Sequence, residues 1–193
     1  MTGAILVGGM NSRIGLKKAF LEIGEKRIID RTVEIYRSIF DEIIIITDTP
    51  EDYRYLKLKT YTDLTPHRGS MGGIYTGLFY SKSDYTFFTA CDMPFINENV
   101  INQIISEAKG DYDIIVPYFK HRLHPLHAVY SMRCMETFKI MVEEQRLKIK
   151  DIFLKFRVKR VADIAEIEPP PFFNINTMED FKQAGKIYSA WLH

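Results

Sequence analysis

The chain has little cysteine, no long apolar run and almost no net charge. Its two cysteines, Cys91 and Cys134, lie far apart and form no C-x-x-C pair, which argues against a disulfide scaffold and favours a reducing cytoplasm. No apolar stretch approaches the roughly 18 residues of a membrane span, and the N-terminus lacks the pattern of a secretion signal. The formal charge of +1 gives no reason to expect nucleic acid or an acidic membrane as a partner. These absences predict a cytoplasmic protein.

What the sequence does contain is an alternation of short apolar runs and helical patterns. The apolar runs are residues 4–7, 43–47, 85–90 and 114–116, and each is bounded by polar or turn residues, as in strands covered on both faces. Between these runs, apolar residues recur at spacings of three or four, over 28–39, 74–80 and 100–105. This order predicts an α/β protein with a doubly wound, mainly parallel sheet that binds ligands beyond the carboxyl ends of its strands.

The second half of the chain is less regular. Residues 128–131 and 157–162 have strand patterns, and residues 134–144 and 150–155 have helical ones. Three prolines at 169–171 exclude a helix and favour an extended connection. Thr177 and Asp180 have the T-x-x-D spacing of a capping box, which predicts a last helix toward Lys186. Because the roughly 20 residues after the prolines are too few for a domain, we expect one domain over residues 1–193.

A glycine-rich basic loop follows the first predicted strand. Glycine lets the backbone approach a ligand closely, and successive N–H groups form an anion-binding concavity that cationic side chains complete. The spacing fits neither the P-loop, which needs G-x-x-x-x-G-K-[ST], nor the dinucleotide fingerprint G-x-G-x-x-G. The loop therefore predicts phosphate binding by a nucleotide enzyme, the alternative being a tight turn after a buried strand. Its glycines are Gly8, Gly9 and Gly15, and its cations are Arg13, Lys17 and Lys18.

Two further loops follow predicted strands. Asp92 comes directly after the strand at 85–90, where a carboxylate can hold Mg²⁺ against nucleotide phosphates; the alternative is a turn before Pro94. Gly72 and Gly73 lie at the start of a predicted helix, where glycine costs about 1 kcal/mol relative to alanine. They indicate that a ligand passes close by or that the helix packs tightly on the sheet.

Histidine and asparagine are concentrated in two other segments. His121, His124 and His127 lack a nearby cysteine or carboxylate and lie in an irregular stretch, so we expect substrate contacts or surface exposure there rather than a metal site. Asn174 and Asn176 precede the last predicted helix. They are suited to hydrogen-bonding a substrate with many polar groups, although asparagine before a helix is usually a cap.

These segments together resemble the molybdenum cofactor guanylyltransferases over nearly the whole chain. The opening loop is similar to the family's L-A-G-G-x-S-x-R-M-G-x-D-K-A-L, with Lys17 where aspartate is usual. Residues 69–74 resemble its G-P-L-x-G-I segment, 91–94 its C-D-x-P metal motif, and 124–130 its P-L-H/F-A-x-Y segment. Residues 174–180 resemble its N-x-N-T-P-E-D ending, with Met178 for the proline.

The resemblance implies a single-domain Rossmann-like fold of the nucleotide-diphospho-sugar transferase type. It implies a Mg²⁺-dependent enzyme that joins GMP from GTP to molybdopterin and releases pyrophosphate, with transient contacts to proteins that deliver molybdopterin or accept the product. By resemblance, the catalytic residues are Arg13, Lys18 and Asp92, with Asp92 the metal ligand; the nucleotide site comprises Leu6, Val7, Gly8, Gly9, Lys18, Asp48, Asp63, Gly72 and Asp92; and Asn174 and Asn176 face molybdopterin.

Other functions share these features. A cytidylyltransferase acting on the same cofactor has a very similar opening loop, and a sugar-phosphate nucleotidyltransferase has a related one. A non-catalytic nucleotide-binding partner in molybdoenzyme assembly is an alternative of a different class. The presence of both Lys18 and Asp92 argues against it.

Overall fold

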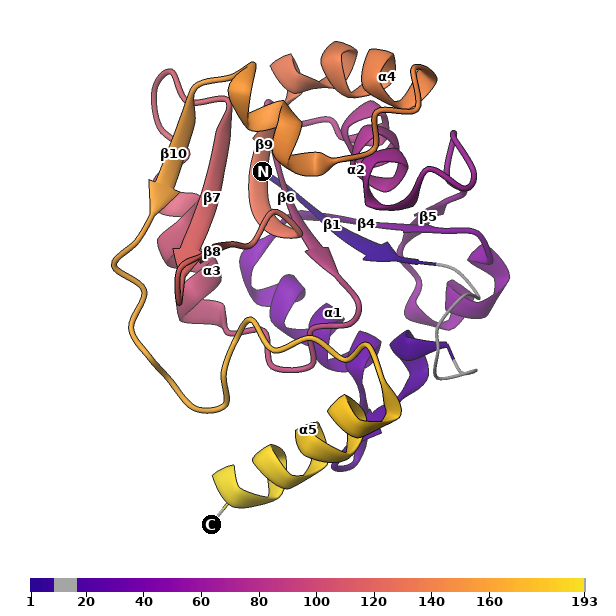
Figure 1. Ribbon diagram of the computed structural model, residues 1–193. Helices are drawn as coiled ribbons and strands as arrows, with labels where there is room; N and C mark the ends of the chain where they lie inside the picture. The colour runs from indigo at the N-terminus through magenta and orange to yellow at the C-terminus, as the bar shows by residue number, and fades with distance from the viewer. Residues whose placement is uncertain (9–16, 193) are drawn as a thin grey trace.

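The computed structural model describes residues 1–8 and 17–192, and a mixed sheet lies at its centre (Figure 1). The sheet has eight strands in the order β10-β7-β9-β6-β1-β4-β5, with β8 paired to β7, and β2 and β3 form a separate hairpin. The strands are β1 (Thr2–Val7), β2 (Glu22–Ile23), β3 (Lys26–Arg27), β4 (Glu42–Thr47), β5 (Lys59–Tyr61), β6 (Tyr85–Ala90), β7 (Ile114–Phe119), β8 (Arg122–Leu123), β9 (His127–Ser131) and β10 (Val158–Val161).

Helices cover both faces of this sheet, α1 and α3 on one and α2 and α4 on the other (Figure 1). Strand β1 shows why both faces are apolar: Ile5 and Val7 pack on the first side, and Ala4 and Leu6 on the second, as the strand's alternation requires. No helix in the described residues is both long and apolar enough for a membrane span. The helices are α1 (Ile28–Ile39), α2 (Gly69–Tyr80), α3 (Glu98–Ser106), α4 (Met135–Glu143) and α5 (Met178–Trp191), and the 3₁₀ turns are η1 (Lys18–Phe20), η2 (Pro50–Leu56), η3 (Met132–Cys134) and η4 (Ile149–Leu154).

The predicted α/β architecture with a mainly parallel sheet is confirmed, with one difference in strand direction. Strands β4, β1 and β6 pair in parallel, but β9 runs antiparallel between β6 and β7. The strand predicted at 114–116 is therefore not a parallel neighbour of the central strands; its parallel partner is β10. The connection from β7 to β9 is too short for a crossover, which needs about a dozen residues or more, so β9 turns back beside β7.

A second difference concerns the helix predicted at 150–155. This segment forms the 3₁₀ turn η4, of which Ile152 is the buried residue. The helical pattern at 134–144 is η3 followed by α4, and the strand pattern at 157–162 is β10.

Residues 162–177 join β10 to α5 and contain neither helix nor strand; we call this segment the C-terminal strap. The three prolines lie within it and no helix forms there, as predicted, but the segment is not extended throughout, because the Phe173 N–H donates to the Pro170 carbonyl at 3.2 Å and closes a turn. The strap reaches the carboxyl edge of the sheet, where the Ile175 N–H donates to the Asp92 carbonyl at 2.9 Å. It ends at the predicted capping box, which is confirmed: the Thr177 side chain accepts from the Asp180 N–H, and the Asp180 carboxylate accepts from the Thr177 N–H.

Candidate active site

Three segments that are distant in sequence meet at the carboxyl edge of the sheet. The Lys18 Nζ lies 3.4 Å from Asp92 Oδ2 and donates to Asn176 Oδ1 at 3.0 Å. Lys18 belongs to η1, Asp92 follows β6, and Asn176 is the last residue before the N-cap of α5. The Cys91 N–H donates to the Leu6 carbonyl at 3.0 Å, so the end of β1 is held beside Asp92. Lys18, Asp92 and Asn176, which belong to separate sequence motifs, therefore form one cluster.

The Asp92 carboxylate carries a charge that its surroundings compensate only in part. Its Oδ1 is enclosed and has no hydrogen-bond partner in the described structure, while Oδ2 faces Lys18. Burial raises the pKa of Asp92, and the charge of Lys18 opposes that rise without cancelling it. A buried, unpaired carboxylate oxygen is costly unless a cation or a donor satisfies it. The electrostatics of Asp92 therefore favour a bound cation.

The donor set at Asp92 fits Mg²⁺. Mg²⁺ prefers hard oxygen ligands and commonly binds through one or two carboxylates, with waters and substrate phosphates completing its shell. In the described residues no group of three or more His, Cys, Asp or Glu side chains gathers as a metal cage. A lone carboxylate with a free oxygen suits a metal that enters together with a triphosphate.

Lys17 and Lys18 are neighbours in sequence but have different partners. Lys17 forms an ion pair with Asp52 of η2 and donates to Thr49 Oγ1 at 3.3 Å. Lys18 instead faces Asp92 and Asn176. Of the two ammonium groups, that of Lys18 is therefore the one directed at the candidate site. Lys18 is also the lysine that the resemblance to the family's opening loop implies.

At the end of β1, the side chains of Leu6 and Val7 are buried, so the backbone is the part that a ligand can contact. Leu6 and Val7 are 8% and 6% exposed, and their side chains belong to the two apolar layers on opposite faces of the sheet. Gly8 is exposed, and a Cβ built on it would meet nothing within 4 Å. Any contact of a nucleotide with Leu6 or Val7 is thus made mainly through their backbone. Gly9 and Arg13 lie outside the described residues.

Asp63 and Gly72 form a tightly packed junction between the loop after β5 and helix α2. The Asp63 Oδ1 accepts from the Thr65 N–H at 2.9 Å and from Thr76 Oγ1 at 2.8 Å. A Cβ at Gly72 would lie 2.8 Å from Thr65 Oγ1 and 2.9 Å from Asp63 Oδ2. The need for glycine at position 72 is therefore explained by packing of the loop on the helix. Asp48 is exposed, directly after β4.

The two asparagines of the strap differ in their contacts. Asn176 is exposed and accepts from Lys18, whereas the Asn174 side chain donates to the nearby Phe172 carbonyl at 3.3 Å. Neither residue is the cap of α5, because Thr177 has that role. The capping alternative for these asparagines is therefore wrong.

Residues of the histidine segment pack against the C-terminal strap. His127 is fully buried, so the expectation of surface exposure is wrong for it, and its Nδ1 lies 2.8 Å from Thr89 Oγ1. His124 stacks on Phe172 with ring centroids 4.2 Å apart. Burial lowers the pKa of His127 to about 3, and it also lowers the pKa of His124, so both rings are neutral near pH 7. The sequence pattern did not indicate the roles of Thr89 and Phe172 in this packing.

Comparisons with known proteins identify relatives of this chain. Residues 3–158 match the family model of the MobA-like NTP transferase domain. The chain is 38% identical over 189 residues to a probable molybdenum cofactor guanylyltransferase of Clostridium perfringens (strain 13 / Type A), covering 94% of each chain. It is 36% identical to the molybdenum cofactor guanylyltransferase of Desulfosudis oleivorans, with coverage of 95% and 94%. The crystal structure of molybdopterin-guanine dinucleotide biosynthesis protein A from Archaeoglobus fulgidus superposes with a TM-score of 0.83 at 26% identity, covering 98% of this chain and all of that one.

Proposed function

We infer the reaction from the family, because the chain belongs to the MobA-like NTP transferases and, within them, to the molybdenum cofactor guanylyltransferases. The protein transfers GMP from GTP to molybdopterin and forms the guanine dinucleotide of the cofactor. A phosphate oxygen of molybdopterin forms a new bond to the α-phosphorus of GTP, the bond between the α-phosphorus and the bridging oxygen breaks, and pyrophosphate leaves. Residues 1–193 are proposed to act as one nucleotidyltransferase domain.

The cluster of Lys18, Asp92 and Asn176 is the observation that carries the proposed mechanism. Its Lys18 ammonium, 3.4 Å from the Asp92 carboxylate, is positioned to hold the triphosphate and to take up charge on the departing pyrophosphate. Asn176, which touches the same ammonium, is proposed to orient the acceptor. Because nucleotidyl transfer needs little covalent help, alignment of the two phosphates accounts for most of what these residues do.

The metal proposed for this site is Mg²⁺, and Asp92 is the residue that would hold it. Bound there, Mg²⁺ would neutralise triphosphate charge and polarise the reacting phosphate. The unpartnered Oδ1 of Asp92 supports this assignment, and so does the pKa of its carboxyl, which burial raises.

The remaining residues are proposed to surround the two substrates. The backbone of Leu6, Val7 and Gly8 would lie along the guanine and the ribose, and Gly9 and Arg13 would bind phosphates. Asp48 and Asp63 would contact the nucleoside, with Gly72 allowing the loop that carries Asp63 to pack closely. Asn174 would act beside Asn176 on the pterin side. A cytoplasmic location, and transient contacts with proteins that deliver molybdopterin or accept the product, complete the proposal.

The test is pyrophosphate release from GTP or CTP in the presence of molybdopterin. Release with GTP, and formation of the guanine dinucleotide, is the expected result. Release with CTP alone would identify a cytidylyltransferase. Binding of GTP without turnover of any nucleotide would instead favour the non-catalytic partner.

A further inference from the structure

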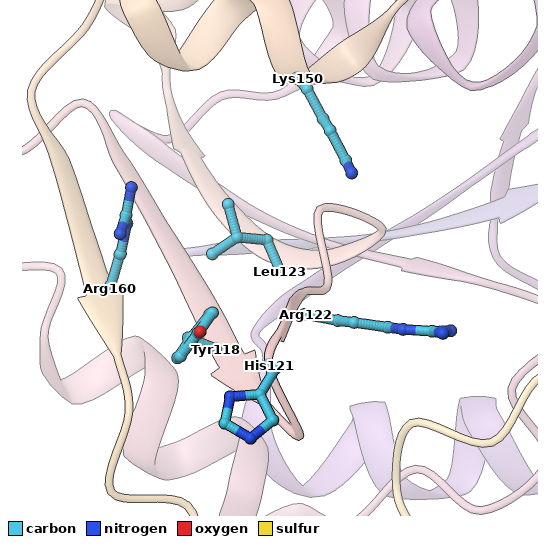
Figure 2. Close-up of a pocket in the computed structure, with 6 residues that line it drawn as sticks. All are labelled: Tyr118, His121, Arg122, Leu123, Lys150 and Arg160. Carbon is cyan, nitrogen blue, oxygen red and sulfur yellow. The ribbon is translucent and has the colours of Figure 1, made fainter.

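Polar groups converge on one carboxylate after β5, which they do not do in the open pocket of Figure 2. That pocket has a volume of about 480 Å³, and its cationic side chains are exposed and extend in different directions (Figure 2). After β5, by contrast, every hydrogen bond that the described residues make to the Asp63 carboxylate reaches its Oδ1. The donors are the Thr76 hydroxyl at 2.8 Å, the Thr65 N–H at 2.9 Å and the Thr65 hydroxyl at 3.2 Å.

The Thr76 hydroxyl is the one of these donors that comes from another element, helix α2. Its side chain is fully buried, and the hydroxyl donates to Asp63 Oδ1 while it accepts from the Leu64 N–H at 3.0 Å. Because an N–H only donates and an ionised carboxylate only accepts, both roles of the hydroxyl are fixed. Water does not compete for a group that is enclosed in this way, which strengthens the hydrogen bond. Helix α2 therefore holds the Asp63 carboxylate in one orientation.

The second carboxylate oxygen of Asp63 has different surroundings. Oδ2 accepts no hydrogen bond from the part of the chain that the structure describes. A Cβ at Gly72 would lie 2.9 Å from it, so the glycine leaves space beside this oxygen. A carboxylate oxygen accepts from an N–H or an O–H group, and both kinds of donor occur on a nucleoside.

Asp63 lies close to the end of β1, where the proposed nucleoside contacts are made by backbone. Strands β1, β4 and β5 pair in parallel, so all three end at the same edge of the sheet. A Cβ at Gly73 would lie 3.2 Å from Leu6 Cδ2. The first turn of α2 therefore contacts β1 through Gly73 and Asp63 through the adjacent Gly72.

We propose that Thr76 is a positioning residue for the nucleotide and that it acts through Asp63. By holding Oδ1, its hydroxyl leaves Oδ2 as the oxygen that accepts from the nucleoside. The inference rests on the proposed function, in which Asp63 contacts the nucleoside of GTP. Thr76 itself is enclosed and touches no substrate.

The test uses two variants of Thr76 and one matched control. Thr76→Val removes the hydroxyl at nearly constant volume, and Thr76→Ser keeps it. Thr86→Val is the control, because Thr86 is equally buried and its hydroxyl donates to Ser81 Oγ at 2.8 Å, at the start of β6. Equilibrium dialysis measures the Kd for GTP, steady-state kinetics give kcat and the KM for each substrate, and thermal melts report folding.

We expect Thr76→Val to raise the Kd and the KM for GTP about three- to tenfold, with kcat and the KM for molybdopterin within about twofold of the wild type. Thr76→Ser should bind GTP like the wild type. Thr86→Val should lower the melting temperature and leave the affinity for GTP unchanged.

A double-mutant cycle with Asp63→Asn separates positioning from a purely structural role. Asparagine keeps one oxygen for the Thr76 hydroxyl and replaces the other by an amide nitrogen, which cannot accept. Asp63→Asn should therefore weaken GTP binding, and adding Thr76→Val should weaken it no further. A purely structural role of Thr76 would raise the Kd by the same factor in both backgrounds.

Unchanged GTP affinity in a folded Thr76→Val variant would overturn the proposal, and so would equal factors in the two backgrounds. If Thr76→Val is unfolded at the assay temperature, Thr76→Ala takes its place in the same comparison. Failure of the proposed function would look different, because the wild type would release no pyrophosphate from GTP with molybdopterin. The dialysis measurements would still decide whether Thr76 acts through Asp63.

Discussion

Lys17 is the N-cap of η1 and Lys18 is its first residue. The contribution of each ammonium group to the candidate site can therefore be tested separately. Replacing Lys18 by methionine removes the charge beside Asp92 and keeps most of the side-chain volume. Because a hydrogen bond to a charged group contributes about 1.5–3 kcal/mol, we expect kcat/KM for GTP to fall about 10- to 100-fold. Steady-state kinetics with varied GTP measure this.

Lys17→Met is the matched control for this prediction. Its ion pair with Asp52 is half-exposed, so we expect a loss of stability below about 1 kcal/mol and little change in turnover. Equal kinetic losses in the two variants would contradict the assignment of Lys18.

Asp92 is predicted to reduce the stability of the protein while it supports catalysis. Asp92→Asn keeps the shape and removes a charge that burial disfavours, so the melting temperature should stay the same or rise. Turnover should fall by at least about a hundredfold and lose its dependence on Mg²⁺ concentration. Thermal melts and a Mg²⁺ titration of the rate measure the two effects.

Asp84→Asn is the control, because Asp84 is exposed and precedes the same strand that Asp92 follows. This variant should keep wild-type turnover. Full Mg²⁺-dependent activity in Asp92→Asn would remove Asp92 from the metal site.

At the level of single residues, the resemblance to the family's motifs named Lys18, Asp92 and Asn176, and it could not give their contacts. In the structure, Lys17 pairs with Asp52, which is distant in sequence and holds the Lys17 ammonium away from Asp92. Similarly, the tight fit of Gly72 depends on Thr65 and Asp63, whose positions follow from the folded loop. Such tertiary partners leave no periodic signal in the sequence.

At the level of elements, the capping box of α5 also fixes the strap at the site. One oxygen of Asp180, Oδ2, accepts from the N–H groups of Asn176 at 2.9 Å and Thr177 at 2.8 Å. We expect Asp180→Ala to cost about 1 kcal/mol of stability, as loss of a cap does. It should also raise the KM for molybdopterin, because Asn176 loses its backbone anchor. Glu179→Ala changes a charge in the same helical turn without this contact, and it should leave that KM unchanged.

The elements themselves were largely predictable, because apolar runs and helical spacing are local signals. The central strands and α1 to α4 appear where these patterns predict them, and α5 begins where the T-x-x-D spacing predicts it. The direction of β9 was not predictable in this way, since it depends on the length of a connection and on its partners on both sides. The helix predicted at 150–155 is instead the 3₁₀ segment η4, because apolar spacing over so few residues suits a short 3₁₀ segment as well as an α-helix.

For the whole molecule, substrate binding should appear as increased stability. A ligand that binds the folded state alone adds about 2.7 kcal/mol at a hundred times its Kd, which corresponds to about 5–10 °C for a chain of this size. We expect this shift for GTP with Mg²⁺ at saturation and a much smaller one in Asp92→Asn. Differential scanning fluorimetry with GTP and with CTP at matched concentrations measures it. An equal or larger shift with CTP would argue against guanine preference.

The contact between Lys18 and Asn176 links the two ends of the chain, and this has a consequence for biosynthesis. During translation, the glycine-rich basic loop and the first strands leave the ribosome long before the C-terminal strap does. The acceptor half of the site therefore cannot assemble until the chain has been released through residue 176. A prematurely terminated chain would lack the residue that meets Lys18, so it could at most retain nucleotide without consuming it.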